Sequence, residues 1–190
     1  MARINENLLV KGARGNVGKQ FVYRKHGNST IIGKMPVYDP KTARSDAQLT
    51  VRDQFTSAAM YARGAVQSPE LKKEYQKKAA PGMSAYNMAL RDYLKAPVVR
   101  KINIDAFDGP PGSTIVVHAK DDFRVTAVRV RIQRVETGEI LEEGNAILAP
   151  VHRDQWIYTT TQAYPSLDGL IVTATATDLP GNEASLAVTT

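Results

Sequence analysis

The sequence predicts an α+β chain in which a β-hairpin and helices over residues 1–97 precede an all-β sandwich over residues 98–190. Two observations predict this division. Apolar residues recur at helical spacing up to Pro97 and at alternate positions after it. Charge changes at the same place: residues 1–97 carry 17 Lys and Arg against 7 Asp and Glu, and residues 98–190 carry 8 against 12. The net charge of +6 therefore combines a basic half with an acidic half.

The N-terminal segment is predicted to form short strands. Residues 17–25 alternate, with Phe21 and Tyr23 on one face and polar residues between them. Turn residues follow at 26–29, and the β-branched run 30–32 completes a β-hairpin.

Glycines punctuate the same segment. The spacing from Gly12 to Gly18 and Lys19 resembles a phosphate-binding loop. That motif requires Gly at position 13 and Ser or Thr at position 20, where this chain has Ala13 and Gln20. We therefore expect the glycines to shape turns and bulges rather than to bind a nucleotide.

Three helices are predicted between residues 41 and 96. Ser45 and Gln48 have the spacing of a capping box, and Ser68 followed by Pro69 marks a second start. Ser84 opens the third helix, which Pro97 ends. The expected buried stripe of the first helix is Val51, Phe55, Ala58, Ala62 and Val66. The corresponding side of the second is Leu71, Tyr75 and Ala79, and that of the third is Tyr86, Leu90, Tyr93 and Leu94.

The remaining residues change to a period of two, as in Val128, Val130 and Ile132 with charged residues between them. Turn residues separate seven or eight short runs of this kind, which is typical of a β-sandwich. The predicted strands are 101–104, 114–119, 128–132, 139–141, 145–148, 155–160, 170–177 and 185–188. The single tryptophan, Trp156, is expected in the core.

Few residues indicate catalysis. The chain has no cysteine, which excludes disulfides and thiolate chemistry, and His26, His118 and His152 are isolated in sequence. Asp121 and Asp122, with Asp178, Asn182 and Glu183, are the best candidates for a calcium site. The favoured interpretation is that they cap turns, and an enzyme that holds a metal there is a third hypothesis.

Basic residues interleaved with aromatic ones in the N-terminal segment give the strongest functional indication. The candidate binding residues are Arg14, Lys19, Phe21, Tyr23, Arg24, Lys25 and Lys34, and the same segment also holds Lys11, Tyr38, Lys41 and Arg44. Three interpretations stay open: a solvated basic face, docking onto an acidic protein surface, or binding to nucleic-acid phosphates. Docking is slightly favoured over nucleic acid, because no recognition-helix or RNA-binding motif is present.

The sequence also carries two family resemblances. The first runs from Gly15-Asn-Val-Gly18-Lys19 through Asp39-Pro40-Lys41-Thr42 to Ser84-Ala-Tyr86-Asn87-Met-Ala89. It resembles a family of small proteins of unknown function from Bacteroidota and their phages, although family members usually carry Gln near positions 43–46. It covers roughly the first half of the chain and implies no active site.

The second half is similar to bacterial immunoglobulin-like domains of surface and virion proteins. The similarity is carried by Val117-His-Ala119, Gly144-Asn-Ala146, Trp156-Ile-Tyr158-Thr159 and the closing Thr175-Ala-Thr-Asp178-Leu-Pro-Gly181-Asn182. The paired cysteines of antibody domains are absent. Such domains act as adhesive or spacer modules and in phages often decorate capsids, which is what the resemblance implies here.

These observations predict a non-enzymatic structural protein without a cofactor, metal or small-molecule substrate. We expect an auxiliary decoration protein of a phage capsid, whose basic module anchors to other virion proteins while the sandwich projects. No secretory signal or membrane span is expected, so the chain would be made in a bacterial cytoplasm and carried in the virion, or otherwise stay cytoplasmic. The alternative is a nucleic-acid-binding protein that uses the basic hairpin.

Overall fold

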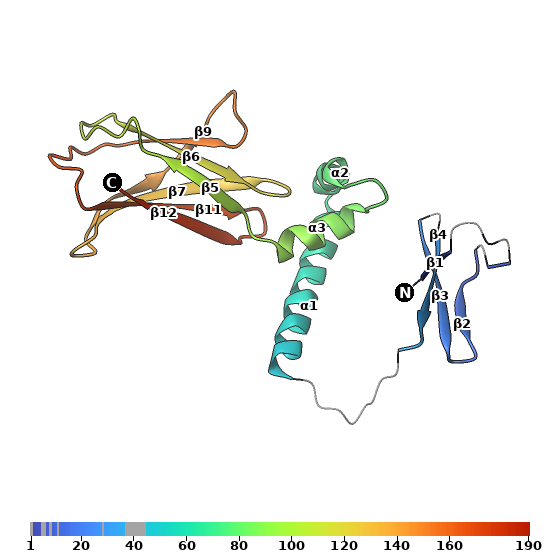
Figure 1. Cartoon of the computed structure of the whole chain (residues 1–190). Coiled ribbons are helices and arrows are strands. Elements are labelled where there is room, and N and C mark those ends of the chain that lie inside the picture. Colours follow the sequence, from blue (N-terminus) through green and yellow to red (C-terminus); the bar gives the residue numbers. More distant parts are fainter. Residues whose placement is uncertain (1, 5–6, 8, 11, 28, 37–44) are drawn as a thin grey trace. The chain divides into compact units, whose positions relative to one another are not determined.

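A computed structural model describes residues 2–4, 7, 9–10, 12–27, 29–36 and 45–190. Within these residues it contains three helices and three four-stranded sheets, which confirms the mixed α+β class (Figure 1). The chain divides into two compact units, Met1–Val51 and Arg52–Thr190. The expected boundary at Pro97 thus lies inside the second unit, where it marks the change from helices to strands. Independent folding of residues 98–190 stays a prediction.

The first unit is a small antiparallel sheet, which we call the basic sheet. Its strands are β1 (Ala2–Ile4), β2 (Gly15–Val17), β3 (Phe21–His26) and β4 (Ser29–Lys34), in the order β1-β4-β3-β2. The predicted hairpin is confirmed as β3 and β4, which pair from Phe21 with Lys34 to His26 with Ser29.

A tight turn joins β2 to β3. Gly18 and Lys19 both have positive φ, and the backbone N–H of Gln20 donates to the carbonyl of Val17. Two successive positive φ values with this hydrogen bond are typical of a type I′ turn, and the pairing of Val17 with Phe21 leaves three residues between the strands. Gly18, which resembled part of a phosphate-binding loop in the sequence, therefore lies in a turn between two strands.

The helices begin at the predicted caps. They are α1 (Asp46–Gln67), α2 (Pro69–Lys78) and α3 (Ala85–Leu94). Ser45 and Gln48 bond each other's backbone N–H groups as a capping box, and the hydroxyls of Ser68 and Ser84 each accept from the N–H three residues on. Each cap satisfies backbone donors that the first helical turn leaves free.

The buried side of α2 agrees with the prediction, since Tyr75 is buried and Leu71 and Ala79 pack against the same cluster, but those of α1 and α3 differ from it. On α1 only Ala58, Ala62 and Ala65 are buried, whereas Val51 and Phe55 are 64% and 53% exposed. On α3 the buried residues are Ala85, Met88, Ala89 and Asp92, and the larger apolar residues of the predicted stripe are only partly buried or exposed. The helices pack through small residues around Tyr75, which allows close approach.

Eight strands follow, and all eight predicted strands are confirmed with shifted ends. They are β5 (Val98–Asn103), β6 (Thr114–Lys120), β7 (Val125–Arg134), β8 (Ile140–Asn145), β9 (Ile147–Leu148), β10 (Gln155–Thr159), β11 (Leu170–Asp178) and β12 (Glu183–Thr189). They form two antiparallel sheets in the orders β5-β6-β10-β9 and β12-β11-β7-β8.

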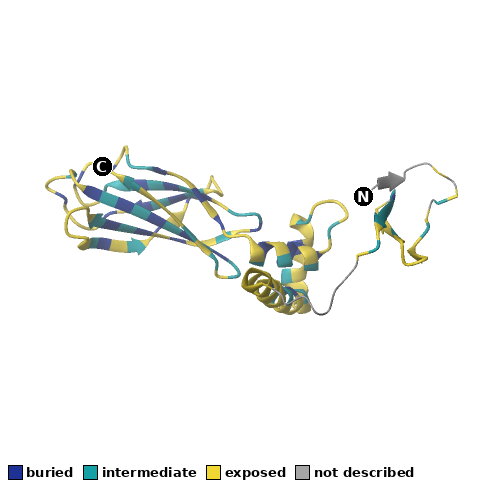
Figure 2. Cartoon of the chain, turned by 60° about the horizontal axis from the view of Figure 1, so that its bottom comes forward, coloured by how far each residue is buried: buried dark blue, intermediate teal, exposed yellow. Residues whose placement is uncertain are grey.

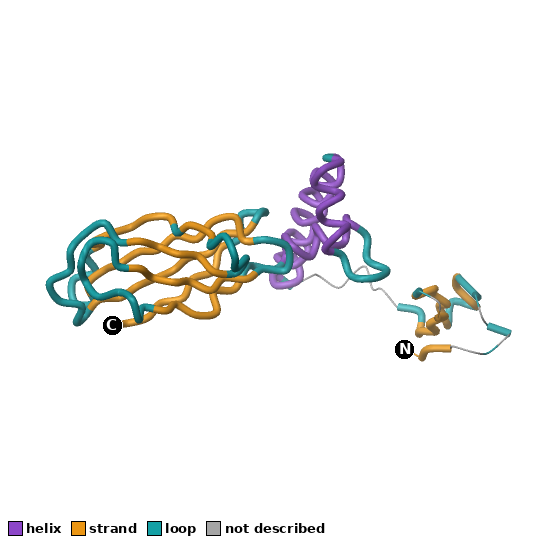
Figure 3. Tube along the Cα trace, turned by 90° about the horizontal axis from the view of Figure 1, so that it is seen from above, coloured by secondary structure: helices purple, strands orange, loops and turns teal. Residues whose placement is uncertain are grey.

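One hydrophobic core joins these two sheets. Ile115 and Val117 of one sheet and Val130 and Val172 of the other belong to it and are fully buried. Trp156 is buried in the same core, as predicted. Buried and outward residues alternate along the strands, as the period of two requires (Figure 2). The helices lie at one end of the sheets, against Phe123 in the β6–β7 loop (Figure 3).

Candidate functional site

The predicted binding residues lie on different parts of the basic sheet. Successive side chains of a strand point to opposite faces, so Phe21, Tyr23 and Lys25 of β3 share one face and Arg24 takes the other. Lys34 pairs with Phe21 and therefore joins the first face. Of the remaining two, Arg14 lies before β2 and Lys19 lies in the β2–β3 turn.

All five predicted cations are exposed, and so is Phe21. Four other residues noted in the sequence, Lys11, Tyr38, Lys41 and Arg44, lie outside the described residues.

Among the described residues, the Phe21 end of this face is exposed. Val17 pairs with Phe21 on this face, and the two side chains are 53% and 46% exposed. Among the described side chains of the first unit only Thr30 is buried, where its hydroxyl accepts from the N–H of Gly12. Apolar and cationic side chains are thus exposed together at the Phe21 end of this face, whereas Thr30, which pairs with Lys25, is buried toward its other end.

The charge of the chain is concentrated in this first unit. Residues 1–51 contain nine Lys and Arg against three Asp and Glu, which equals the +6 of the whole chain. Residues 52–190 contain sixteen of each sign. The excess of Lys and Arg in the helices is therefore balanced by the excess of Asp and Glu in residues 98–190.

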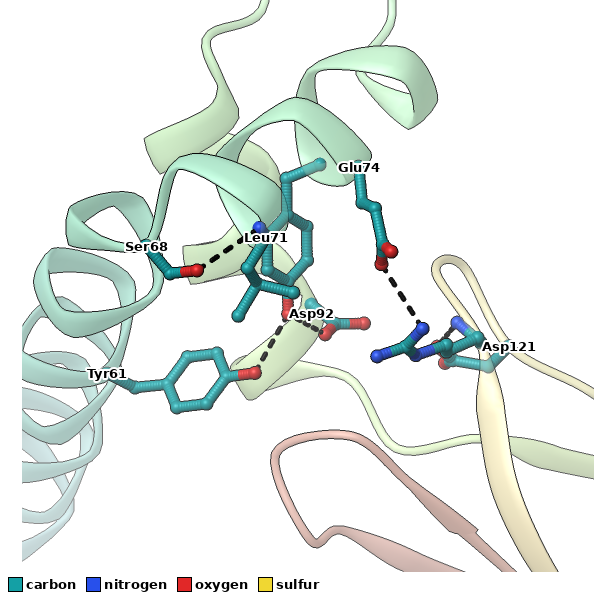
Figure 4. A network of polar contacts seen from close by, with 8 residues as sticks. Tyr61, Ser68, Leu71, Glu74, Asp92 and Asp121 are labelled. Carbon is teal, nitrogen blue, oxygen red and sulfur yellow. Dashed lines mark hydrogen bonds and ion pairs between the residues drawn. The ribbon is translucent and has the colours of Figure 1, made fainter.

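Ion pairs join the helices to the sheets at the contact that we call the helix–sheet junction. Asp122, in the β6–β7 loop, forms ion pairs with Arg91 at 2.8 Å and with Lys95 at 2.9 Å. The Lys95 hydrogen bond is the main reason that the pKa of Asp122 is lowered. Arg124 pairs with Glu74 of α2 at 3.2 Å (Figure 4). Some cations of the basic half are thus paired with carboxylates of the acidic half of the same chain.

A buried polar network lies at the same junction. Tyr75 donates to Asp92 at 2.7 Å, and its hydroxyl contacts that of Tyr61 at 2.8 Å (Figure 4). The ring of Tyr75 stacks on Phe123. Burial is the main reason that the pKa of Asp92 is raised to about 7; the Tyr75 hydrogen bond opposes the shift, and the Asp121 carboxyl adds to it. Sequence patterns miss this network because an aspartate in a helix is expected to face solvent.

Two of the acidic residues proposed for calcium, Asp121 and Asp178, cap turns in the structure. Asp178 accepts from the backbone N–H groups of Gly181 and Asn182, and Asp121 accepts from those of Phe123 and Arg124. These bonds match the favoured turn interpretation. Within the described parts of the chain, no three His, Cys, Asp or Glu side chains are grouped to hold a metal ion.

Glu142 is the most heavily bonded carboxylate in the second unit. Tyr158 and Tyr164 donate to it at 2.8 and 2.5 Å, and Thr161 donates from its N–H at 2.7 Å. Burial alone would raise the pKa of Glu142, but these hydrogen bonds lower it. Its oxygens are saturated by donors that tie β8 to the loop after β10, so its role is structural.

A second basic surface, which the sequence does not predict, lies beside the junction. A cavity of about 700 Å³, which we call the basic cavity, separates α2 from the outer side of the β5-β6-β10-β9 sheet. Its cationic lining residues are Lys77, Lys78, Arg100, Lys120, Arg124 and Arg153. Two smaller depressions adjoin it and share Arg100 and Lys120 with it. These cations are scattered over 77 positions of the sequence, so no local pattern indicates the cavity.

Comparison with known proteins adds no family. No protein-family model matches the chain, and no curated protein is similar enough to count as a match. In the part of the chain that the structure describes, no helix is both long and apolar enough to cross a membrane.

Proposed function

We propose that the chain is a non-enzymatic structural protein that attaches to an acidic protein assembly through the Phe21 face of its basic sheet. The observation that carries this proposal is the exposure of Val17 and Phe21 on this face, with Lys34 paired to Phe21 and Lys25 further along the same face of β3. A small sheet needs a hydrophobic face packed against something to be stable. A partner with apolar residues and carboxylates would supply both missing contacts.

We further propose that residues 98–190 form an immunoglobulin-like sandwich. Support comes from the strand orders β5-β6-β10-β9 and β12-β11-β7-β8. If the eight strands are lettered A, B, C, C′, D, E, F and G along the chain, these orders read ABED and GFCC′. This is the arrangement of immunoglobulin domains. Such a module has a closed core of its own and can project from the attached sheet.

A protein partner suits this face better than nucleic acid does. Tyr23 is only partly exposed, and the residues beside the aromatic rings are the aliphatic Val17 and Ile32 rather than further planar groups. Stacked bases need exposed rings, whereas a protein interface needs apolar contacts with a charged rim. Nucleic-acid binding through the same cations remains the second hypothesis and is an outcome of the test below.

The identity of the assembly rests on resemblance. Bacterial immunoglobulin-like domains often decorate capsids, so we propose an auxiliary capsid protein of a phage, located in the virion. Charge and exposure support an acidic assembly in general, and the virion is the further step that an experiment must test.

A matched pair of variants tests the attachment. Lys25 and Arg24 are adjacent exposed cations of β3 that point to opposite faces. In pull-down of the full chain on purified phage particles, Lys25→Glu should weaken binding at least about tenfold, and Arg24→Glu should change it far less. Equal losses for both variants would contradict docking through the Phe21 face.

Random-sequence duplex DNA provides the second arm. The proposal expects little binding at physiological salt. Tight binding that falls with salt at a slope near −0.9 for each phosphate contact, with equal loss for Lys25→Glu and Arg24→Glu, would instead establish the nucleic-acid hypothesis.

A further inference from the structure

The basic cavity of the second unit holds cations that the chain leaves unpaired. Arg124 is bound to Glu74, but within the described residues Lys77, Lys78, Arg100, Lys120 and Arg153 make no ion pair. All five are exposed. Two other carboxylates line the cavity. Asp121 accepts two backbone hydrogen bonds within its own turn, so Asp154 is the carboxylate left to balance these five cations. The lining therefore has a clear excess of free positive charge.

A β-bulge lies at Arg100, one of these lining cations. The pairing of β5 with β6 shifts between Val99 and Lys101, so Arg100 is an extra residue in the strand. As a result Arg100 and Lys101, although adjacent, are both exposed, while Val99 and Ile102 both reach the core. Bulges of this kind redirect side chains, and this one places a second cation on the outer side of the sheet.

The rest of the lining favours a protein ligand. Leu148 of the edge strand β9 and Val125 contribute apolar surface. Phe123 is the only aromatic residue of the described lining, and it is buried against Tyr75 rather than free to stack on a base. Cations around an apolar floor suit a ligand that carries carboxylates together with aliphatic side chains.

The same unit carries such a surface at its other end. Three loops, residues 104–113, 135–139 and 160–169, are linked by backbone hydrogen bonds between Tyr164 and Gly109 and between Val135 and Gly169. We call them the acidic loops. Their exposed carboxylates are Asp105, Asp108, Glu136, Glu139 and Asp168. They contain no Lys or Arg, and Glu139 alone among these five pairs with a cation, Arg134. Val135 is an exposed apolar residue among them.

The two surfaces lie at opposite ends of the same strands. Strand β6 begins at Thr114, beside the acidic loops, and ends at Lys120, in the cavity. Its seven residues separate the two surfaces by roughly 20 Å, at about 3.4 Å per residue. One copy therefore cannot fill its own cavity with its own acidic loops.

We propose that the basic cavity receives the acidic loops of a second copy of this chain, so that the copies associate head to tail. Because the two contacting surfaces differ, a pair of copies still has one free cavity, on one copy, and one free set of loops, on the other. Such heterologous contacts produce rings or open chains rather than closed pairs. This inference stands independently of what the basic sheet binds.

Sedimentation velocity of the full chain at low ionic strength tests the proposal. Wild-type chain should form dimers and longer species as its concentration rises, and added salt should dissociate them because exposed charge pairs are screened. The double variant Arg100→Glu with Lys120→Glu, the cavity variant, reverses two positive charges of the cavity. The double variant Asp108→Lys with Asp168→Lys, the loop variant, reverses two negative charges of the acidic loops. Each double variant should associate at least about tenfold more weakly. Lys72→Glu with Lys73→Glu is the matched control, since both residues lie on α2 outside the lining.

Mixing the two defective variants provides the decisive readout, and it also shows that both have folded. The cavity variant retains its loops and the loop variant retains its cavity, so together they should form a heterodimer and nothing larger. Wild-type chain that stays monomeric at the highest soluble concentration would overturn the proposal. So would association that persists in the cavity variant. Association lost in Arg24→Glu with Lys25→Glu, but kept in the cavity variant, would assign the acidic loops to the basic sheet instead.

Discussion

Asn in place of Asp92 should stabilise the chain at alkaline pH. Asp92 is fully buried, and Tyr75 donates to one of its oxygens while the other has no partner among the described residues. Asp121, whose carboxyl adds to the raised pKa of Asp92, also has a buried oxygen without a donor. In Asp92→Asn the amide oxygen can still accept from Tyr75, and the amide N–H₂ can donate toward Asp121 without a titrating proton.

The size of the effect follows from the pKa. Its value for Asp92 rises from 3.8 in the unfolded chain to about 7 in the folded one, so the folded chain retains a proton that the unfolded chain releases. The stability from this proton is complete below about pH 4 and is lost as the pH rises through about 7. At 1.36 kcal/mol for each tenfold change in acidity, the total loss approaches roughly 4 kcal/mol. For a chain of this length that corresponds to a change in Tm of about 10 °C.

Thermal unfolding of both proteins from pH 5 to pH 8, followed by far-ultraviolet circular dichroism of the helices, measures the effect. The difference in Tm between Asp92→Asn and wild type should increase by roughly 5–10 °C from pH 5 to pH 8, because about two of the three pH units over which the stability is lost lie in this range. Taking the difference cancels titrations that the two proteins share, such as those of Asp122 and Glu142, whose lowered pKa values act in the opposite direction. A difference that is constant over this range would refute a buried, protonated Asp92.

Two further predictions concern stability. In Gly144→Ala the new Cβ would lie 2.8 Å from the ring of the buried Tyr158, so the free energy of unfolding should fall by about 1–3 kcal/mol in denaturant titration. Gly64→Ala is its control: with an ordinary φ and no neighbour within 4 Å it should stabilise α1 by about 0.5–1 kcal/mol, and an equal loss in both variants would contradict the argument. Ser84→Ala removes the α3 cap and should cost about 1 kcal/mol, whereas an unchanged midpoint would show that the cap contributes nothing.

Local chemistry explains what the sequence predicted well. The three serine caps, the β3–β4 hairpin and the eight later strands depend on neighbouring residues: a hydroxyl three positions before a backbone N–H, a turn between alternating runs, or a period of two. The capping role of Asp121 and Asp178 follows from the same short-range preference. These features require no knowledge of which distant segments meet.

Long-range packing explains what the sequence missed. Asp92 looks like a solvated residue in the sequence because its partner, Tyr75, is 17 positions away. The buried face of α3 differs from the predicted one because α3 packs through Ala85, Met88 and Ala89 rather than through its tyrosines and leucines. The basic cavity is lined by residues of α2, β5, β6 and the segment before β10, which are distant in sequence. One local pattern does indicate the bulge that contributes to it. Val99 and Ile102 are three residues apart where a regular strand has an even spacing, and this indicates the bulge at Arg100.

The charge division takes a different meaning in the structure. Residues 52–97 carry eight Lys and Arg against four Asp and Glu, and residues 98–190 carry the opposite excess of four. The pairs of Arg91 and Lys95 with Asp122 join these two segments directly. The unbalanced charge therefore belongs to the first unit, and that unit is where the search for an external partner should begin.

The most direct test of attachment uses particles purified from bacteria that carry this gene. Immunogold labelling against the second unit should decorate the particle surface, and quantitative mass spectrometry should find the chain in a fixed ratio to the major particle protein. Complementation with Lys25→Glu and Lys34→Glu should release the chain from the particles, whereas Arg24→Glu should leave it bound. A chain absent from the particles, or one that fractionates with DNA and responds equally to both sets of changes, would contradict the account.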